Sequence, residues 1–336
     1  MPALITHYQF ANDVYDELYN YIGGSRDEAD AFFLGNQGPD PLFYGLANPA
    51  YSASHRLAQR MHREKPDKLL AAFKAAVRKL RENDRQIGRA YVLGFVCHYL
   101  LDSTMHPFVY AQEYALCDAG EPGLTRDNAS DVHALIETEL DELVLSTRRN
   151  ETIATFNPSK VVLKASDRVL DVISKLYVNV ASDVFDQQIP PNTYKVALKL
   201  FRKVAAVFHS PDGLKRNVLG RLEMLIRPYS FVRAMSHHNR LIYESDFDNR
   251  NHEVWINPWD ESPCTLSFFE LYDKALSRAL CEIVTFDEND FETDKCESIT
   301  QTLNFRGESV VASIISVEEA PAPDQLPAEE VYEVDA

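Results

Sequence analysis

The chain has 336 residues, of which 45% are hydrophobic and 11% are aromatic. This composition can supply a large core, so a globally disordered chain is excluded. Its 51 acidic residues outnumber its 34 basic residues, and the formal charge of −17 argues against a broad surface for nucleic acid or for an anionic bilayer. A phosphate-bearing substrate would need a local positive centre, which bound divalent ions can provide.

The N-terminal segment and the cysteines predict a cytoplasmic protein. Residues 1–7 read MPALITH, with no basic region, no long apolar run and no small-residue cleavage site. The sequence has no run of about 18 apolar residues, so we expect no transmembrane segment. The five cysteines are widely spaced and form no CxxC pair, which favours reduced thiols over a disulfide framework.

The first unusual feature is a loop at residues 32–41 with the sequence FFLGNQGPDP. Asp40 lies between two prolines, and the following proline favours an extended backbone at Asp40. Its carboxylate is either aimed rigidly at a ligand or bonded to its own backbone in an ordinary turn. Phe43, Tyr44 and Tyr51 lie nearby in the sequence. We expect them in the core, or facing a quaternary ammonium headgroup beside a metal site.

Two helices are predicted next. Residues 65–89 have apolar side chains at spacings of three and four, which indicates an amphipathic helix. We expect His62 to lie at an exposed helix start, at the surface rather than as a ligand. Residues 91–101 are apolar on nearly every side, which is typical of a short buried helix. Pro107 then discourages continuation of that helix.

His98, Asp102 and His106 are spaced at i, i+4 and i+8 across this apolar segment. On a helix they share one face. Burying such groups without partners costs roughly 2–7 kcal/mol each, and more when the group is charged. Either the three side chains satisfy one another by hydrogen bonding or a metal ion satisfies them, because imidazole nitrogen and carboxylate oxygen are normal zinc ligands.

A further helix is predicted at residues 130–145, with His133 and Glu137 at i and i+4. Taken alone, such a pair usually lies on a solvated helix face. However, six of the ten histidines fall within the first 133 residues, which favours a shared metal site.

The rest of the chain divides into helices and a tail. We predict helices at residues 159–185, 193–208, 214–235 and 267–284, and an aromatic loop at 246–263. We expect a helical domain over residues 1–290 and a C-terminal extension over 291–336, largely disordered from about residue 318, where acidic residues and prolines dominate.

The order of eight histidine and acidic residues along the chain resembles the pattern of the zinc-dependent phospholipase C family, which is related to the P1-type nucleases. These positions are His7, Asp40, His55, His98, Asp102, His106, His133 and Glu137. The resemblance covers roughly residues 1–140. It implies an all-α, multi-helix fold and a site for two or three zinc ions.

The resemblance also implies a role for each residue. His55, His98, Asp102 and Asp40 would surround one zinc, Asp102 would bridge to a second zinc that also takes His7, and His106, His133 and Glu137 would hold the third. Asp40 would in addition act as general base.

Two features depart from the family pattern. Three residues separate Asp102 from His106, where secreted members have five, and the chain begins Met1-Pro2 where those members have tryptophan. If Met1 is removed, the free Pro2 nitrogen is a further ligand hypothesis.

We therefore expect a zinc-dependent phosphoric ester hydrolase that uses metal-activated water on a phospholipid or another phosphodiester. A P1-like nuclease and a non-catalytic helical metal-binding protein are the alternatives. The sequence predicts no oligomeric state.

Overall fold

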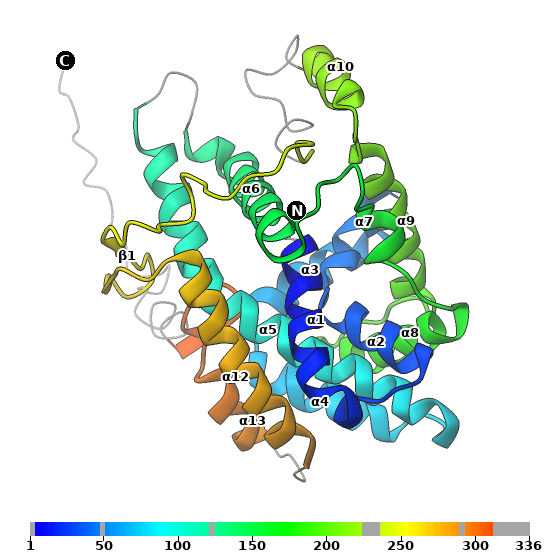
Figure 1. The fold of residues 1–336 in the computed structure, drawn as a ribbon. Helices are drawn as coiled ribbons and strands as arrows, with labels where there is room; N and C mark the ends of the chain where they lie inside the picture. The colour runs from blue at the N-terminus through cyan, green and yellow to red at the C-terminus, as the bar shows by residue number, and fades with distance from the viewer. Residues whose placement is uncertain (1–3, 48–50, 121–124, 224–235, 289–292, 312–336) are drawn as a thin grey trace, which may run out of the picture.

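The structure, a computed structural model, describes residues 4–47, 51–120, 125–223, 236–288 and 293–311. The predicted all-α class is confirmed, since helices make up almost all of the regular structure in these ranges (Figure 1). The described sheet is a short antiparallel pair, β1 (Trp255–Ile256) and β2 (Pro263–Cys264), with Trp255 opposite Cys264. All five cysteines are free thiols. No helix in the described ranges is both long and apolar enough to cross a membrane.

The helices are, in chain order, α1 (Leu4–Ile22), α2 (Arg26–Gly35), the 3-10 helix η1 (Asp40–Ala47), α3 (Ala53–Arg63), α4 (Pro66–Arg78), α5 (Glu82–Cys117), the 3-10 helix η3 (Arg126–Asn128), α6 (Ala129–Arg149), α7 (Pro158–Val161), α8 (Asp167–Phe185), α9 (Thr193–Phe208), α10 (Leu214–Glu223), α12 (Phe268–Glu288) and α13 (Thr293–Thr300). The predicted helix at 193–208 is therefore confirmed to the residue. The segment 224–235 of another predicted helix lies outside the described residues.

Two of the predicted helices are each divided. The segment 65–89 contains all of α4 and the start of α5, because Arg81 adopts an extended backbone (φ −60°, ψ 147°) that breaks the helix. The segment 159–185 contains α7 and α8. There Ser166 caps the new helix by accepting a hydrogen bond from the Val169 backbone N–H.

The prediction that Pro107 would end its helix is wrong, because α5 continues through it to Cys117. Proline removes the hydrogen bond to the carbonyl four residues earlier, which here is that of Ser103. Gly307 packs directly against this place: a Cβ on Gly307 would lie 2.5 Å from Pro107 Cγ and 2.9 Å from the Ser103 oxygen. Packing around the buried proline offsets the lost hydrogen bond.

Helix α5 is the centre of the fold, and α1, α2, α4, α6, α8 and α12 pack around it (Figure 1). Its closest neighbour is α2, where two glycines let the backbones touch. A Cβ on Gly35 would lie 2.2 Å from the Tyr91 carbonyl oxygen, and a Cβ on Gly94 would lie 2.2 Å from that of Phe32. This contact holds the end of α2, and the loop that follows it, against one turn of α5.

That loop then passes directly over His98. Gly38 has a φ of +48°, and a Cβ there would lie 2.1 Å from His98 Cδ2. Both the backbone conformation and the space therefore require glycine. Asp40 follows and opens η1, so its predicted extended backbone is wrong; the backbone N–H of Asp40 instead donates to the Gln37 carbonyl.

Helix α1 begins at a buried carboxylate from α6. Asp141 accepts hydrogen bonds from the Ile5 and Thr6 backbone N–H groups at 2.9 and 2.7 Å, and from the Thr6 hydroxyl at 2.7 Å. The first N–H groups of a helix have no partner within it, so Asp141 acts as their cap. His7 is the next residue, and its position depends on this contact.

Residues 293–311 pack against the same core as the helices before them. Helix α13 lies on α4, and Cys296, Ile299 and Phe305 are fully buried. The predicted disorder from about residue 318 falls outside the described residues.

We expect Gly94→Ala to lower the free energy of unfolding by about 1–3 kcal/mol, because the methyl group would meet the Phe32 backbone. Gly88→Ala in the same helix is the matched control, since its Cβ would meet only side chains, the nearest being Leu80 Cδ1 at 2.4 Å. Urea denaturation measures both variants. A Gly94→Ala variant as stable as the control would contradict the backbone contact between α2 and α5.

Candidate metal centre

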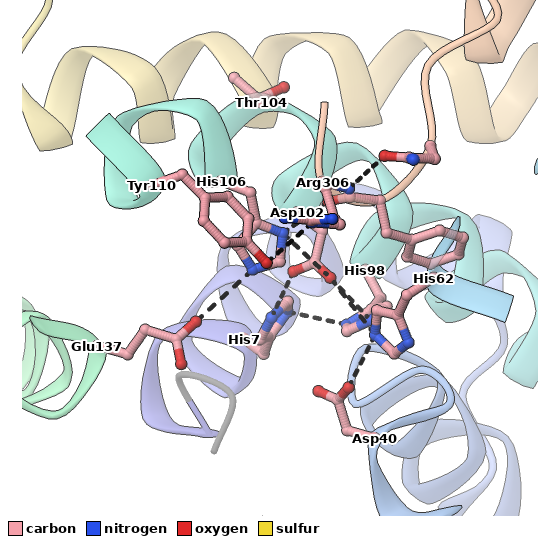
Figure 2. Close-up of polar contacts among 12 residues, drawn as sticks. His7, Asp40, His62, His98, Asp102, Thr104, His106, Tyr110, Glu137 and Arg306 are labelled. Carbon is pink, nitrogen blue, oxygen red and sulfur yellow. Dashed lines mark hydrogen bonds and ion pairs between the residues drawn. The ribbon is translucent and has the colours of Figure 1, made fainter. Parts of the chain in front are cut away.

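Five elements place titratable side chains around one point of α5 (Figure 2). They contribute His7 from α1, Asp40 from η1, His62 from α3, His98, Asp102 and His106 from α5, and His133 and Glu137 from α6. These elements are far apart in the sequence, so only the tertiary fold brings the side chains together.

Asp102 lies at the middle of this cluster, with its side chain 6% exposed. Its Oδ1 is 3.0 Å from His7 Nε2, and its Oδ2 is 3.3 Å from His98 Nε2 and 3.8 Å from His106 Nδ1. The helical spacing on α5 thus brings His98 and His106 to the same carboxylate from either side. His7 reaches it from α1.

Asp40 and His62 form the edge of the cluster next to η1. His62 Nε2 is 3.1 Å from Asp40 Oδ1 and 4.0 Å from Asp102 Oδ2. The prediction that His62 lies at the surface is wrong, since its side chain is only 13% exposed. The apolar residues of α3 already mark the face on which His62 lies, because Ala58 is one turn before it and is buried.

His55 lies on the same helix, away from the close groups of ligand atoms. Its Nδ1 faces the Phe43 carbonyl oxygen at 3.3 Å, and its ring packs against Phe43. Within the described residues it joins none of the sets of three that could hold one ion. His55 does line the pocket next to this cluster, but it is His62 whose Nε2 faces Asp40 and Asp102.

The third part of the cluster lies between α5 and α6. His133 Nε2 is 3.2 Å from Glu137 Oε1, and His106 Nε2 is 3.7 Å from the same oxygen. The short spacing after Asp102 puts His106 one helical turn further along α5, where it still faces Glu137. The departure from the family spacing does not remove His106 from this group.

Three sets of potential ligands each have one atom per residue within 4.8 Å of the others: His7, Asp40 and His98; His62, His98 and Asp102; and His106, His133 and Glu137.

Four of the histidines are fixed through Nδ1, which leaves Nε2 facing a carboxylate of the cluster. The partners of Nδ1 are the carbonyl oxygens of Asn36 for His98 (3.1 Å), Ala58 for His62 (2.7 Å) and Phe305 for His106 (2.6 Å), and the carboxylate of Glu113 for His133 (2.7 Å). Carbonyl and carboxylate oxygens only accept, so Nδ1 of each ring carries a proton. The neutral form of each imidazole would then present the Nε2 lone pair to a metal ion, as in metal-binding histidines.

Sequence reasoning missed Glu113, the partner of His133. It is buried on α5, seven residues after His106, and this spacing places it on the same face of the helix. That spacing is the signal that could have revealed it.

Two buried atoms in the cluster have no hydrogen-bond partner among the described residues, His98 Nε2 and Asp40 Oδ2. A buried polar atom without a partner costs about 1–3 kcal/mol. A divalent ion would satisfy both, since imidazole nitrogen and carboxylate oxygen are zinc ligands. The donor set therefore fits a metal.

The electrostatics keep the carboxylates ionised. Burial alone would raise the pKa of Asp102, but nearby His98, His106 and His7 hold that pKa well below its usual range. His133 and His106 do the same for the pKa of Glu137. Conversely, burial works against protonation of His106, but Asp102 and Glu137 raise its pKa to about 9. Asp102 and Glu137 therefore keep the negative charges that attract a cation.

A pocket of about 480 Å³ opens onto this cluster. Its polar floor includes Asp40, Asp102 and Glu137, and its walls include the apolar side chains Phe43, Tyr44, Val204 and Phe208. The volume suits a small-molecule site.

Of the predicted substrate-contacting aromatics, Phe43 and Tyr44 line the pocket, and Tyr44 also stacks on Phe201. Tyr51 is not among the lining residues, and its hydroxyl donates to Asn192 Oδ1 at 3.0 Å. The hypothetical ligand Pro2 lies outside the described residues.

Comparison with known proteins agrees with this geometry. Residues 6–186, more than half of the chain, match the sequence profile of the family described as zinc dependent phospholipase C. The matched region contains every residue of the cluster from His7 to Glu137. No curated protein and no solved structure matches the chain. The chain belongs to the zinc-dependent phospholipase C family.

Proposed function

We propose that this protein is a zinc-dependent hydrolase of phosphoric esters and that its substrate is a phospholipid or a related phosphodiester. The observation that carries the proposal is the cluster of buried histidines and carboxylates, several of which line an open pocket: Asp40, His62, Asp102, His106, His133 and Glu137. A purely structural metal site is normally closed by four protein ligands, whereas a catalytic one faces substrate.

Two or three zinc ions would be held by the three sets of ligands. In this proposal Asp102 and His98 belong to the central set, and His62 takes the role that the resemblance gave to His55. When bound, zinc supplies positive charge and Lewis acidity to water and to a phosphoryl group.

Asp40 is the proposed general base. Asp40 lines the pocket, and its Oδ1 is 3.1 Å from His62 Nε2. Its carboxylate would accept the proton of a water that attacks the phosphorus atom. The contact with His62 fixes the orientation of that carboxylate.

The walls of the pocket support a lipid-like substrate. Phe43 and Tyr44 from η1 and Val204 and Phe208 from α9 all line the pocket, so an apolar part of the substrate would pack against them. The formal charge of −17 disfavours a long polynucleotide, for which a P1-like nuclease would need a basic surface. The cytoplasmic location expected from the sequence remains part of this proposal.

We expect the zinc-loaded protein to hydrolyse a soluble short-chain phosphodiester, and a chelator to abolish the reaction. Asp102→Asn should lose bound zinc and activity together, because it removes the charge at the centre of the cluster. Elemental analysis and a phosphodiesterase assay measure the two effects.

Asp118→Asn is the control for this experiment, since Asp118 lies at the end of the same helix with its side chain 57% exposed. Full zinc content in Asp102→Asn, or hydrolysis that survives complete chelation, would count against the proposal.

A second pair of variants separates the two histidines of α3. We expect His62→Ala to reduce zinc content and the turnover number, because His62 Nε2 faces Asp40 and Asp102. His55→Ala should keep the wild-type zinc content, since His55 bonds instead toward the Phe43 carbonyl. The opposite pattern would restore His55 as the ligand.

Zinc binding should release protons near neutral pH. The pKa values of His7, His62 and His133 are raised, because neighbouring carboxylates outweigh the effect of burial, and that of His106 is raised to about 9. Zinc needs neutral imidazole. Protons therefore compete with zinc at neutral pH, and the affinity should rise as the pH increases toward about 9. Calorimetry in buffers of different ionisation enthalpy measures the release, and an affinity independent of pH would rule it out.

A further inference from the structure

The C-terminal segment at residues 303–309 lies beyond the part of the chain that matches the family, yet it reaches the metal centre. The backbone N–H of Phe305 donates to the His62 carbonyl at 3.2 Å, and its carbonyl accepts from His106 Nδ1 at 2.6 Å. The Phe305 ring also packs against His98. These contacts set the next residue, Arg306, on the wall of the pocket (Figure 2).

The guanidinium of Arg306 is held in one direction by two aromatic rings. It lies 4.5 Å from the ring centre of Tyr110 and 4.8 Å from that of Trp259, and its Nε donates to the Tyr110 hydroxyl at 3.1 Å. Tyr110 comes from α5 and Trp259 from the loop after β1. A side chain held against two rings loses little further freedom when it binds a ligand.

The charge of Arg306 is poorly matched within the protein. Its ion pair among the described residues is with Glu308 at 3.8 Å, and the Glu308 carboxylate also accepts from the Asn304 amide at 3.2 Å. By contrast, Arg89 contacts Asp287 through Nη2 at 2.6 Å and through Nε at 2.9 Å. Arg306 is only 20% exposed, so it has lost much of its water without gaining a close anion.

The Arg306 side chain is not needed to hold residues 303–309 in place. The backbone carbonyl of Arg306 accepts from Trp259 Nε1 at 2.8 Å, and its N–H donates to Asn304 Oδ1 at 2.8 Å. The backbone contacts of Phe305 add to these. The guanidinium of Arg306 is therefore available to bind a ligand in the pocket.

We propose that Arg306 binds the phosphate group of the substrate, and of the phosphorylated product, at the metal centre. The planar guanidinium presents paired N–H donors that match phosphate oxygens, and it remains charged at every physiological pH. Arg306 lines the same pocket as Asp102 and His106, and Figure 2 draws it next to Asp102. The apolar remainder of the ester lies along Phe43 and Tyr44. The identity of the substrate in this inference rests on the proposed function. The binding of phosphate by Arg306 does not depend on it.

The test uses the full chain loaded with zinc, with inorganic phosphate as the probe. We expect Arg306→Gln to weaken phosphate binding by about tenfold or more, and to raise KM for a short-chain phosphodiester by a similar factor. Zinc content and melting temperature should stay at the wild-type values. Arg306→Lys should recover part of the affinity, because it keeps the charge but loses the fork of donors.

Arg278→Gln is the matched control, since Arg278 donates to the Ile299 carbonyl and so ties α12 to the same C-terminal region without lining the pocket. It should leave phosphate affinity unchanged. An Arg306→Gln variant that binds phosphate as tightly as wild type overturns the inference, and so does one whose zinc content falls, because Arg306 would then support the metal site. If the wild-type protein cleaves no phosphodiester, the proposed function fails, and the phosphate titration still decides the role of Arg306.

Discussion

Asp102 is a carboxylate buried at the centre of the longest helix, and a charge in that position is costly unless other groups compensate it. Three histidines surround it, from α1 and from the turns of α5 on either side. Much of the fold serves to bring them there. Asp141 fixes the start of α1 beside His7, and Gly38 lets the loop after α2 lie flat on His98. Among the described residues His98 Nε2 still has no hydrogen-bond partner, and a bound cation would supply a partner.

The sequence could predict the parts of the site that depend on helical periodicity. His98, Asp102 and His106 share a face of α5 because their spacing requires it, and His133 and Glu137 pair for the same reason on α6. From the sequence we predict His55 as a ligand and His62 at an exposed helix start, although residues seven apart lie on one face of a helix. Which of them meets Asp40 depends on how η1 packs against α3, and no local pattern contains that information.

The errors in the predicted elements have a common cause. In each case tertiary packing outweighs the local conformational preference of the residues. Pro107 remains inside α5 because Gly307, two hundred residues away, packs against it. Asp40 enters a 3-10 helix despite the proline that follows it, because the close contact of Gly35 with Gly94 fixes the start of that loop. Likewise, Phe305 and Arg306 join the site through contacts with α3 and α5. Contacts between residues so far apart in the sequence produce no periodic pattern from which they could be predicted.

The central claim is that these histidines and carboxylates hold zinc ions in a pocket open to substrate. Crystals of the zinc-loaded protein, measured with X-rays on both sides of the zinc absorption edge, would locate the ions directly. The account predicts two or three anomalous peaks, with Asp102 and the Nε2 atoms of His62, His98 and His133 in direct contact with them. A single peak, or peaks that leave Asp102 uncoordinated, would contradict it.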